Sequence, residues 1–221
     1  MSIKENLHKL YQEIPENVQL VAVSKTKPAG DILEAYHAGH RVFGENKAQE
    51  LIAKQPKLPE DIQWHYIGHL QSNKVKYLAP FVALIHSLDR KKLIKEVNKE
   101  AKKNNRIIEG LLQFHIAEED TKFGLSLEEA RAILASDAFK DYENIRITGV
   151  MGMATFTTDE AQIRKEFRQL KQIFTTLKAE FFGDKPWFKD ISAGMSGDYK
   201  IAIEESSTII RLGSVIFGQR N

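Results

Sequence analysis

Residues 20–27 read LVAVSKTK, a short apolar run that ends in a serine, two lysines and a threonine. The apolar part is typical of a buried strand, because apolar residues follow one another without a polar interruption. Pro28 and Gly30 then break the pattern, and apolar residues at helical spacing continue to Gly39. The stretch therefore predicts one strand followed by one helix, with Lys25 at the carboxyl end of the strand.

The same unit repeats along the chain as a short apolar run, a polar or glycine-bearing tip, and a helix. We predict strands at residues 20–23, 41–43, 64–67, 82–85, 109–116, 145–151, 188–192 and 208–211. Strands that alternate with helices favour a parallel sheet, and eight of them favour closure into a barrel. An open doubly wound sheet is the alternative, but no early GxGxxG motif supports it. We predict an α/β fold, a (β/α)8 TIM barrel.

An extra helix is expected before the first strand. Ser2 and Glu5 have the spacing of a capping box, and apolar residues follow at helical spacing at positions 3, 7, 10 and 14. No tract rich in proline, serine or glycine divides the chain into two parts. We therefore expect residues 1–221 to form a single domain.

The composition excludes several classes of protein. Lysine and arginine number 32 against 30 aspartates and glutamates, and this near balance gives little support to nucleic-acid binding. The chain has no cysteine, which excludes disulfides, thiolate zinc sites and a cysteine nucleophile. No apolar run reaches the length of a signal peptide core or a membrane span. We expect a cytoplasmic protein without nucleic-acid or membrane partners.

The carboxyl ends of barrel strands meet at one mouth, so residues far apart in sequence converge there. Four histidines lie in or just after predicted strands, at positions 65, 69, 86 and 115, and none forms a helical pair of metal-ligand spacing. We interpret them as hydrogen-bonded packing residues and predict no metal site. The side chains expected at the mouth are Lys25, Asn46, His69, Ser87, His115, Met151, Ser196 and Arg211.

Two short loops near the C-terminus favour a phosphorylated ligand. They are 194–197, GMSG, after the seventh strand, and 213–214, GS, after the eighth. Phosphate in TIM barrels tends to bind at these two loops. Glycine lets the backbone approach an anion, and Ser196 and Ser214 add hydroxyl donors. The alternative is that both are ordinary strand–helix turns in which serine caps the helix.

Lys25 would lie opposite these loops, where a deprotonated lysine amine can form a Schiff base. Partial burial and the nearby cations Lys27 and Arg211 would disfavour its ammonium form. The ligand that this arrangement implies is a phosphorylated aldehyde. The alternative is a solvated surface lysine, which is the common state of this residue type.

Six motifs occur in unbroken order from about residue 20 to the C-terminus. They are VAVSKTKP at 21–28, FGEN at 43–46 with QE at 49–50, WHYIGHLQSNK at 64–74, GVMGMA at 149–154, GMSGD at 194–198 and RLGSVIFG at 211–218. In this order they resemble the signatures of the pyridoxal phosphate (PLP) homeostasis protein family, which is related to the barrel domain of alanine racemase. The resemblance implies a PLP-binding barrel that holds the cofactor as a Schiff base on Lys25.

The resemblance also implies which residues make the remaining contacts with PLP, when the family's binding residues are matched motif by motif to this sequence. It implies that Arg211 faces the pyridine nitrogen, that Asn46 lies near the ring, and that the phosphate is held by Ser196, Gly197, Gly213 and Ser214. The chain departs from the family pattern at Ala193, where a methionine is expected, and at Ser214, where threonine is also familiar. Neither departure removes a hydrogen-bond donor. Lys122 lies where the family often has a lysine that binds PLP secondarily, but we favour a solvated charge there.

Arg211 restricts the chemistry that the resemblance implies. A guanidinium only donates hydrogen bonds, so the pyridine nitrogen stays unprotonated and the ring becomes a weak electron sink. Transaminases and decarboxylases are therefore disfavoured. Racemases of the alanine racemase family take a second acid or base from an additional β domain, whereas this chain ends at Asn221. Racemization would then need another acid or base from the barrel mouth, such as His69.

We therefore predict a protein that holds PLP and takes part in intracellular PLP homeostasis, with no catalytic residue. The expected partners are PLP and apo PLP-dependent enzymes, and we expect a monomer. The alternatives are a PLP-dependent racemase or lyase, and a Schiff-base aldolase that acts on a phosphosugar.

Overall fold

The computed structural model describes residues 2–119 and 123–219. Its strands pair in parallel with their sequence neighbours, and the first strand also pairs with the last, so the sheet is a closed barrel. The strands are β1 (Gln19–Val23), β2 (Val42–Glu45), β3 (Gln63–Tyr66), β4 (Leu84–Leu88), β5 (Ile108–Gln113), β6 (Ile145–Met151), β7 (Asp190–Ser192) and β8 (Ile209–Leu212). The predicted TIM barrel is confirmed.

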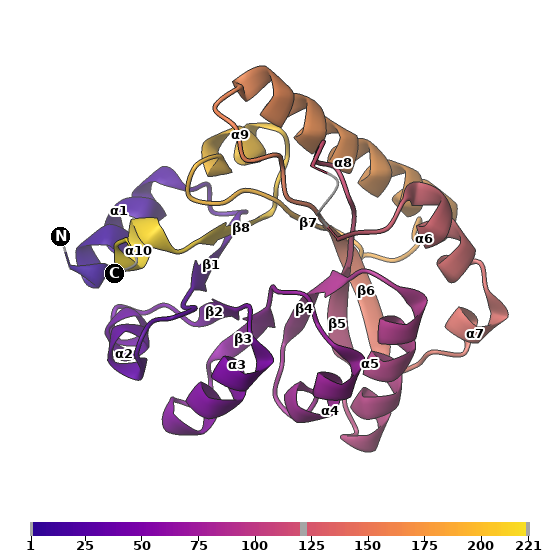
Figure 1. Ribbon diagram of the computed structural model, residues 1–221, viewed down its shortest axis with the longest axis horizontal. Coiled ribbons are helices and arrows are strands. Elements are labelled where there is room, and N and C mark those ends of the chain that lie inside the picture. The colour runs from indigo at the N-terminus through magenta and orange to yellow at the C-terminus, as the bar shows by residue number, and fades with distance from the viewer. Residues whose placement is uncertain (1, 120–122, 220–221) are drawn as a thin grey trace.

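The helices form a ring around the strands (Figure 1). In the described chain the α-helices are α1 (Ile3–Glu13), α2 (Ala29–His37), α3 (Ala48–Lys54), α4 (Val75–Leu78), α5 (Lys91–Lys103), α6 (Leu127–Leu134), α7 (Asp137–Lys140), α8 (Glu160–Phe181), α9 (Tyr199–Glu204) and α10 (Ser214–Phe217). Two short 3-10 helices, η1 (Gln55–Lys57) and η2 (Ser72–Lys74), complete the set. The predicted N-terminal helix is α1, and both hydrogen bonds of its Ser2–Glu5 capping box are present.

Two apolar layers stabilise the barrel. The larger one lies between strands and helices, where alternate strand residues pack against the inward faces of the helices. The smaller one is contributed by five strands and fills part of the barrel interior with Val21, Leu84, Leu111, Met151 and Ile209. The interior of the barrel is therefore a packed core and not a channel.

Several strands end at other residues than predicted, and the fourth and fifth differ most. β4 ends at Leu88, so His86 and Ser87 lie inside the strand and are fully buried, whereas they were expected at its tip. β5 ends at Gln113, three residues before the predicted end at residue 116. Polar residues suggest a strand end when only the sequence is read. Inside a closed barrel they can remain in the strand when they find hydrogen-bond partners there.

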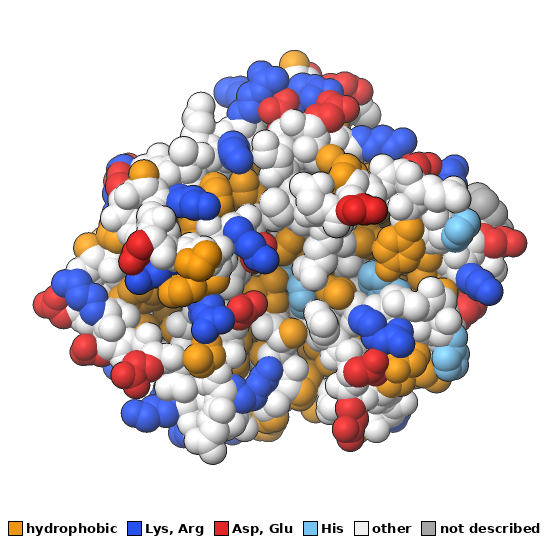
Figure 2. Space-filling view, turned by 180° about the vertical axis from the view of Figure 1, so that it is seen from behind, with side chains coloured by type: hydrophobic (Ala, Val, Ile, Leu, Met, Phe, Trp, Pro, Cys, Tyr) orange, Lys and Arg blue, Asp and Glu red, His pale blue; other side chains and the backbone are white. Residues whose placement is uncertain are grey.

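One face of the molecule shows how the charged side chains are distributed. On the face drawn in Figure 2, acidic and basic side chains lie interspersed around the rim, as the nearly balanced composition predicts. Among the helices of residues 2–119 and 123–219, none is both long and apolar enough to cross a membrane.

His40 fastens α1 to the start of β2. Its Nε2 donates to the carbonyl oxygen of Val42 at 2.7 Å, so the neutral ring accepts at Nδ1 from the Tyr11 hydroxyl at 2.6 Å. Burial lowers the pKa of His40 to about 4. The folded protein therefore keeps this ring neutral at pH values where an exposed histidine would be charged.

Mild acid should destabilise the protein through His40. The pKa is about 4 when folded and returns to about 6.5 in the unfolded chain. Below about pH 6.5 the unfolded state binds a proton that the folded state does not, so the free energy of unfolding falls as the pH drops toward 4. One such group lowers the free energy of unfolding by an amount that approaches about 1.4 kcal/mol for each pH unit. Urea unfolding at pH 7, 6 and 5 measures this pH dependence.

His40→Gln tests this assignment because the amide keeps a donor and an acceptor but cannot titrate. Its slope between pH 6 and 5 should be shallower than that of the wild type. The exposed His8 provides the matched control, and His8→Gln should leave the slope unchanged. Equal slopes in wild type and His40→Gln would contradict the assignment.

Candidate functional site

A cavity of about 500 Å³ lies at the carboxyl ends of the strands. Its volume falls within the range of small-molecule sites, about 300–1,000 Å³. The structure brings together in its lining every residue predicted to contact a ligand, namely Lys25, Asn46, Ser196, Gly197, Arg211, Gly213 and Ser214. These residues come from both ends of the chain, and closure of the barrel makes them neighbours.

The expectation for the rest of the mouth is only partly correct. His69 lines the cavity, whereas Ser87, His115 and Met151 are absent from the lining that the described residues form. Ser87 and Met151 are buried inside their strands, and the ring of His115 donates from Nε2 to the Glu119 carbonyl at 2.8 Å. Successive strand residues point to opposite faces, so a residue at or near a strand end need not face the cavity. Lys122 lies outside the described residues.

Lys25 lies in a tight turn directly after β1. The buried Ser24 donates its backbone N–H to the Gly44 carbonyl at 3.0 Å, which extends the pairing with β2. The N–H of Lys27 donates back to the Ser24 carbonyl at 3.0 Å and closes the turn. The ammonium of Lys27 donates to the carbonyl of Phe217 at 2.9 Å, at the end of α10. The turn thus carries two lysines, and Lys27 also ties it to the C-terminal helix.

Arg211 places a buried cation in the cavity wall. It belongs to β8 and is only 4% exposed. Its Nη1 donates to the Ser192 hydroxyl at 2.5 Å and its Nη2 to the Gly152 carbonyl at 3.2 Å. Burial lowers the pKa of Arg211 to about 10, so the guanidinium remains charged at neutral pH. The site therefore offers a fixed donor and no proton acceptor at this position.

A chain of polar side chains supports Arg211 from inside the barrel. His86 bonds Ser192 Oγ through Nδ1 at 2.9 Å and His65 Nδ1 through Nε2 at 3.0 Å. Burial holds the pKa of His86 well below its usual range and lowers that of His65 to about 3, so both rings are neutral. Because Arg211 can only donate, Ser192 Oγ accepts from it, and His86 links Ser192 to His65.

Ser192 and His86 are the supporting residues that sequence reasoning did not assign. The interpretation of His86 as a hydrogen-bonded packing residue is correct, but it gives no link to Arg211, and Ser192 lies just before the predicted glycine loop without an assigned role. Their partners come from strands far away in sequence, so no local signal identifies them. Within the described ranges, no group of three His, Cys, Asp or Glu residues could hold a metal ion.

The loop after β7 depends on a glycine. Gly194 has a φ of 93°, and a Cβ atom there would lie 2.7 Å from the side chain of Ala202 and 2.9 Å from the Tyr199 backbone. The Asp198 carboxylate accepts from the N–H of Met195 at 2.5 Å and closes the loop. A Cβ at Gly197 would meet nothing within 4 Å. The loop is thus fixed at its base, while the backbone at Gly197 stays accessible.

Comparison with known proteins agrees with this geometry. The family model described as alanine racemase, N-terminal domain, matches residues 1–221. An alanine racemase from E. faecalis has a TM-score of 0.77 at 15% identity over 99% of this chain and 58% of that chain, which shows a shared fold alone. The class is therefore the alanine racemase-type (β/α)8 barrel.

More similar proteins lie within this class. The PLP homeostasis proteins of Aquifex aeolicus and Vibrio alginolyticus are 38% and 35% identical, over 91% and 100% of this chain and 87% and 98% of their own lengths. PipY of Synechococcus elongatus, solved without PLP, has a TM-score of 0.92 at 35% identity over 98% of this chain and 100% of that chain. Solved with PLP bound, it has a TM-score of 0.88 at 34% identity and the same coverage. The chain belongs to the pyridoxal phosphate homeostasis protein family, as its motifs predicted.

Replacing Ser192 with alanine should destabilise the fold. Arg211 Nη1 and His86 Nδ1 would both lose their shared partner inside the barrel, and a buried polar group without a partner costs about 1–3 kcal/mol. We expect the free energy of unfolding to fall by about 2 kcal/mol in urea titrations. Ser196→Ala, in the accessible loop, is the control and should change stability by less than about 0.5 kcal/mol. Equal small effects of both variants would contradict the support assigned to Ser192.

Proposed function

We propose that the chain binds PLP in the cavity at the barrel mouth, holds it as a Schiff base on Lys25, and takes part in PLP homeostasis without turnover. The observation that carries this proposal is the convergence of one lysine, a buried arginine and two glycine–serine loops on a single cavity. The names of the high-coverage relatives and the PLP bound to PipY support it.

The residues of the cavity suit the parts of the PLP molecule. Around Gly197 the backbone is open enough for close approach of a phosphate, and Ser196 and Ser214 add hydroxyl donors. A guanidinium has five N–H donors, and the contacts with Ser192 and Gly152 occupy one on each Nη atom. Arg211 therefore has further N–H groups, which could donate a hydrogen bond to a pyridine nitrogen. We assign Asn46 to the ring and Gly213 to the phosphate.

The covalent step needs only Lys25 and the ligand. PLP would supply an aldehyde, and an unprotonated Lys25 amine would be the nucleophile that holds it, with loss of one water made from the aldehyde oxygen and the two amine hydrogens. The remaining residues bind and orient the ligand. The tight turn after β1 restricts Lys25, and the loops after β7 and β8 hold the opposite end of the cavity.

The site favours binding over catalysis. Arg211 can only donate to a ring nitrogen, and its hydrogen-bond partners among the described residues are the Ser192 hydroxyl and the Gly152 carbonyl. An unprotonated ring withdraws electrons weakly, so it stabilises a carbanion poorly. The high-coverage relatives are named homeostasis proteins and not racemases. We accordingly assign no catalytic residue.

We extend the proposal to the cellular setting. The chain would act as a monomeric single domain in the cytoplasm and supply PLP to apo PLP-dependent enzymes. The lack of cysteine fits a reducing compartment. Nearly balanced charges do not favour nucleic acid as a partner.

Reduction of the PLP-loaded protein with borohydride should place the label on Lys25. Borohydride converts a Schiff base into a stable amine, so peptide mass spectrometry then names the modified residue. Lys25→Ala should abolish the visible absorbance and the label, whereas Lys27→Met is the matched control and should retain both. Label on Lys27 or Lys122 with Lys25 unmodified would contradict the site assignment.

The same preparation tests the absence of turnover. Amino acids deuterated at the α-carbon should keep their label in the presence of the loaded protein. Rapid loss of deuterium that Lys25→Ala abolishes would instead identify a PLP-dependent racemase or lyase. Colourless protein that cleaves a ketose phosphate would identify an aldolase.

A further inference from the structure

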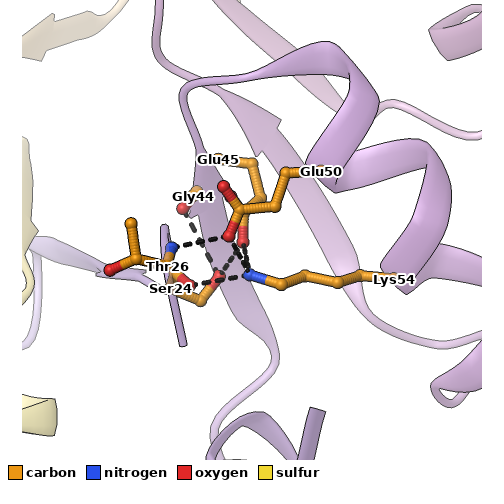
Figure 3. Close-up of polar contacts among 6 residues, drawn as sticks. All are labelled: Ser24, Thr26, Gly44, Glu45, Glu50 and Lys54. Atoms are coloured by element: carbon orange, nitrogen blue, oxygen red, sulfur yellow. Dashed lines mark hydrogen bonds and ion pairs between the residues drawn. The ribbon is translucent and has the colours of Figure 1, made fainter. Parts of the chain in front are cut away.

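An ionic cluster lies beside the Lys25 turn but outside the cavity. Its members, Ser24, Thr26, Glu45, Glu50 and Lys54, come from the end of β1, the end of β2 and from α3 (Figure 3). In the described part of the chain, none of the five lines the cavity. The cluster therefore cannot act by touching a ligand there and must act through the residues that it holds.

The ammonium group of Lys54 is the centre of the cluster. It donates to the Ser24 carbonyl at 2.9 Å, to Glu45 Oε1 at 2.7 Å and to Glu50 Oε1 at 2.6 Å. A lysine ammonium has three N–H donors, so these acceptors use all of them. The Lys54 side chain is 11% exposed and that of Glu45 is fully buried. Such charge-assisted bonds are stronger away from water than on an open surface.

The cluster holds the backbone on both sides of Lys25. On one side, Ser24 accepts from Lys54 through its carbonyl and donates from its hydroxyl to Glu45 Oε1 at 2.7 Å. On the other side, the N–H of Thr26 donates to Glu50 Oε1 at 2.6 Å. Lys25 is the residue between these two attachments. Its backbone position is therefore set by carboxylates and an ammonium from other elements.

Thr26 shows why the turn needs such support. Its φ is 67°, in the left-handed region that β-branched residues rarely adopt. Residues held in sparsely populated backbone regions cost about 1–3 kcal/mol and persist only where their surroundings impose the conformation. The bond from Thr26 N to Glu50 is one such restraint. Without this hydrogen bond, fewer contacts would keep Thr26 in the left-handed region, and the turn could relax toward an ordinary backbone conformation.

Glu50 is the member that can be altered with the least damage to the core. Burial raises the pKa of Glu45, against the hydrogen bonds from Lys54 and Ser24, and its Oε2 has no hydrogen-bond partner among the described residues. Loss of Lys54 would leave that buried carboxyl without its cation, which is strongly destabilising. Glu50 is 22% exposed. Its removal leaves the contact of Lys54 with Glu45 in place.

We propose that Glu50, together with Lys54, is a positioning residue for Lys25. The pair holds residues 24–27 in the turn that presents the Lys25 amine to the cavity. The inference rests on the proposed function, because it assumes that Lys25 is the group that reacts with PLP. It goes beyond that function in assigning a role to residues that do not line the cavity.

Glu50→Ala and Glu50→Gln form the test pair. Glutamine keeps an oxygen that can accept from Thr26 and Lys54, whereas alanine keeps none. We expect Glu50→Ala to slow formation of the borohydride-trappable PLP adduct on Lys25 about tenfold, the cost of one hydrogen bond to a charged group. Glu50→Gln should stay within about threefold of the wild type, because a neutral acceptor forms a weaker bond.

A ligand without the aldehyde separates positioning from general damage. Pyridoxine 5′-phosphate has the ring and the phosphate of PLP but cannot form a Schiff base. Its affinity, measured by calorimetry, should be the same in Glu50→Ala and wild type, because the phosphate loops and Arg211 are untouched. Parallel losses of adduct formation and of pyridoxine 5′-phosphate binding would overturn the inference. So would wild-type adduct formation in Glu50→Ala.

Two readouts do not depend on PLP and keep the inference separate from the proposed function. Amide hydrogen exchange at Thr26 should accelerate about tenfold or more in Glu50→Ala and much less in Glu50→Gln. The pH profile for acetylation of Lys25 by acetic anhydride should change in Glu50→Ala, while that of Lys9 should not. If wild-type protein forms no Lys25 adduct, the proposed function fails, and these two readouts still decide the inference. Unchanged exchange and an unchanged profile would overturn it.

Discussion

The pairing of β1 with β8 is the contact on which the site depends. It places Val21 opposite Arg211 and Ala22 opposite Leu212, so the first strand of the chain lies in register with the last. The turn that follows β1 then lies against the loop that follows β8, where a Cβ at Gly213 would be 3.3 Å from the Val23 carbonyl. Barrel closure thus makes one cavity from two ends of the chain, and opening the barrel would separate the lysine from the arginine.

The barrel interior is divided between an apolar layer and a polar chain. Five apolar side chains pack together there, whereas Arg211 continues into Ser192, His86 and His65. Burying a cation is costly unless it finds partners. Here the Ser192 hydroxyl and the Gly152 carbonyl accept from the guanidinium, and the negative charge of Asp198, which also lines the cavity, favours its charged form. The same arrangement restricts the chemistry that a bound pyridine ring could support.

The sequence was sufficient for the barrel, because alternating apolar runs and helices are local patterns. It also placed the seven expected ligand contacts in the cavity, since strand ends and glycine loops mark the mouth, but it wrongly placed Ser87, His115 and Met151 there. The supporting contacts were not predictable in the same way. Ser192 and His86 meet across strands 106 positions apart, and no local spacing encodes that contact. Glu50 did lie in a quoted motif, but its bond to Thr26 requires the left-handed turn that only the structure shows.

Lys25 and Arg211 are supported from opposite sides of the barrel wall. Successive strand residues face opposite ways, so Gly44 points toward the interior side chains of Val21 and Ile67, whereas Glu45 points outward to Lys54 on α3. Arg211, in contrast, is held from inside by Ser192. Among the described contacts the two networks share no residue, so the backbone around Lys25 and the guanidinium of Arg211 are held by separate sets of residues. A site ordered before its ligand arrives loses less conformational entropy on binding. This advantage suits a protein whose proposed task is to hold a reactive aldehyde, because retention depends on the bound state and not on a transition state.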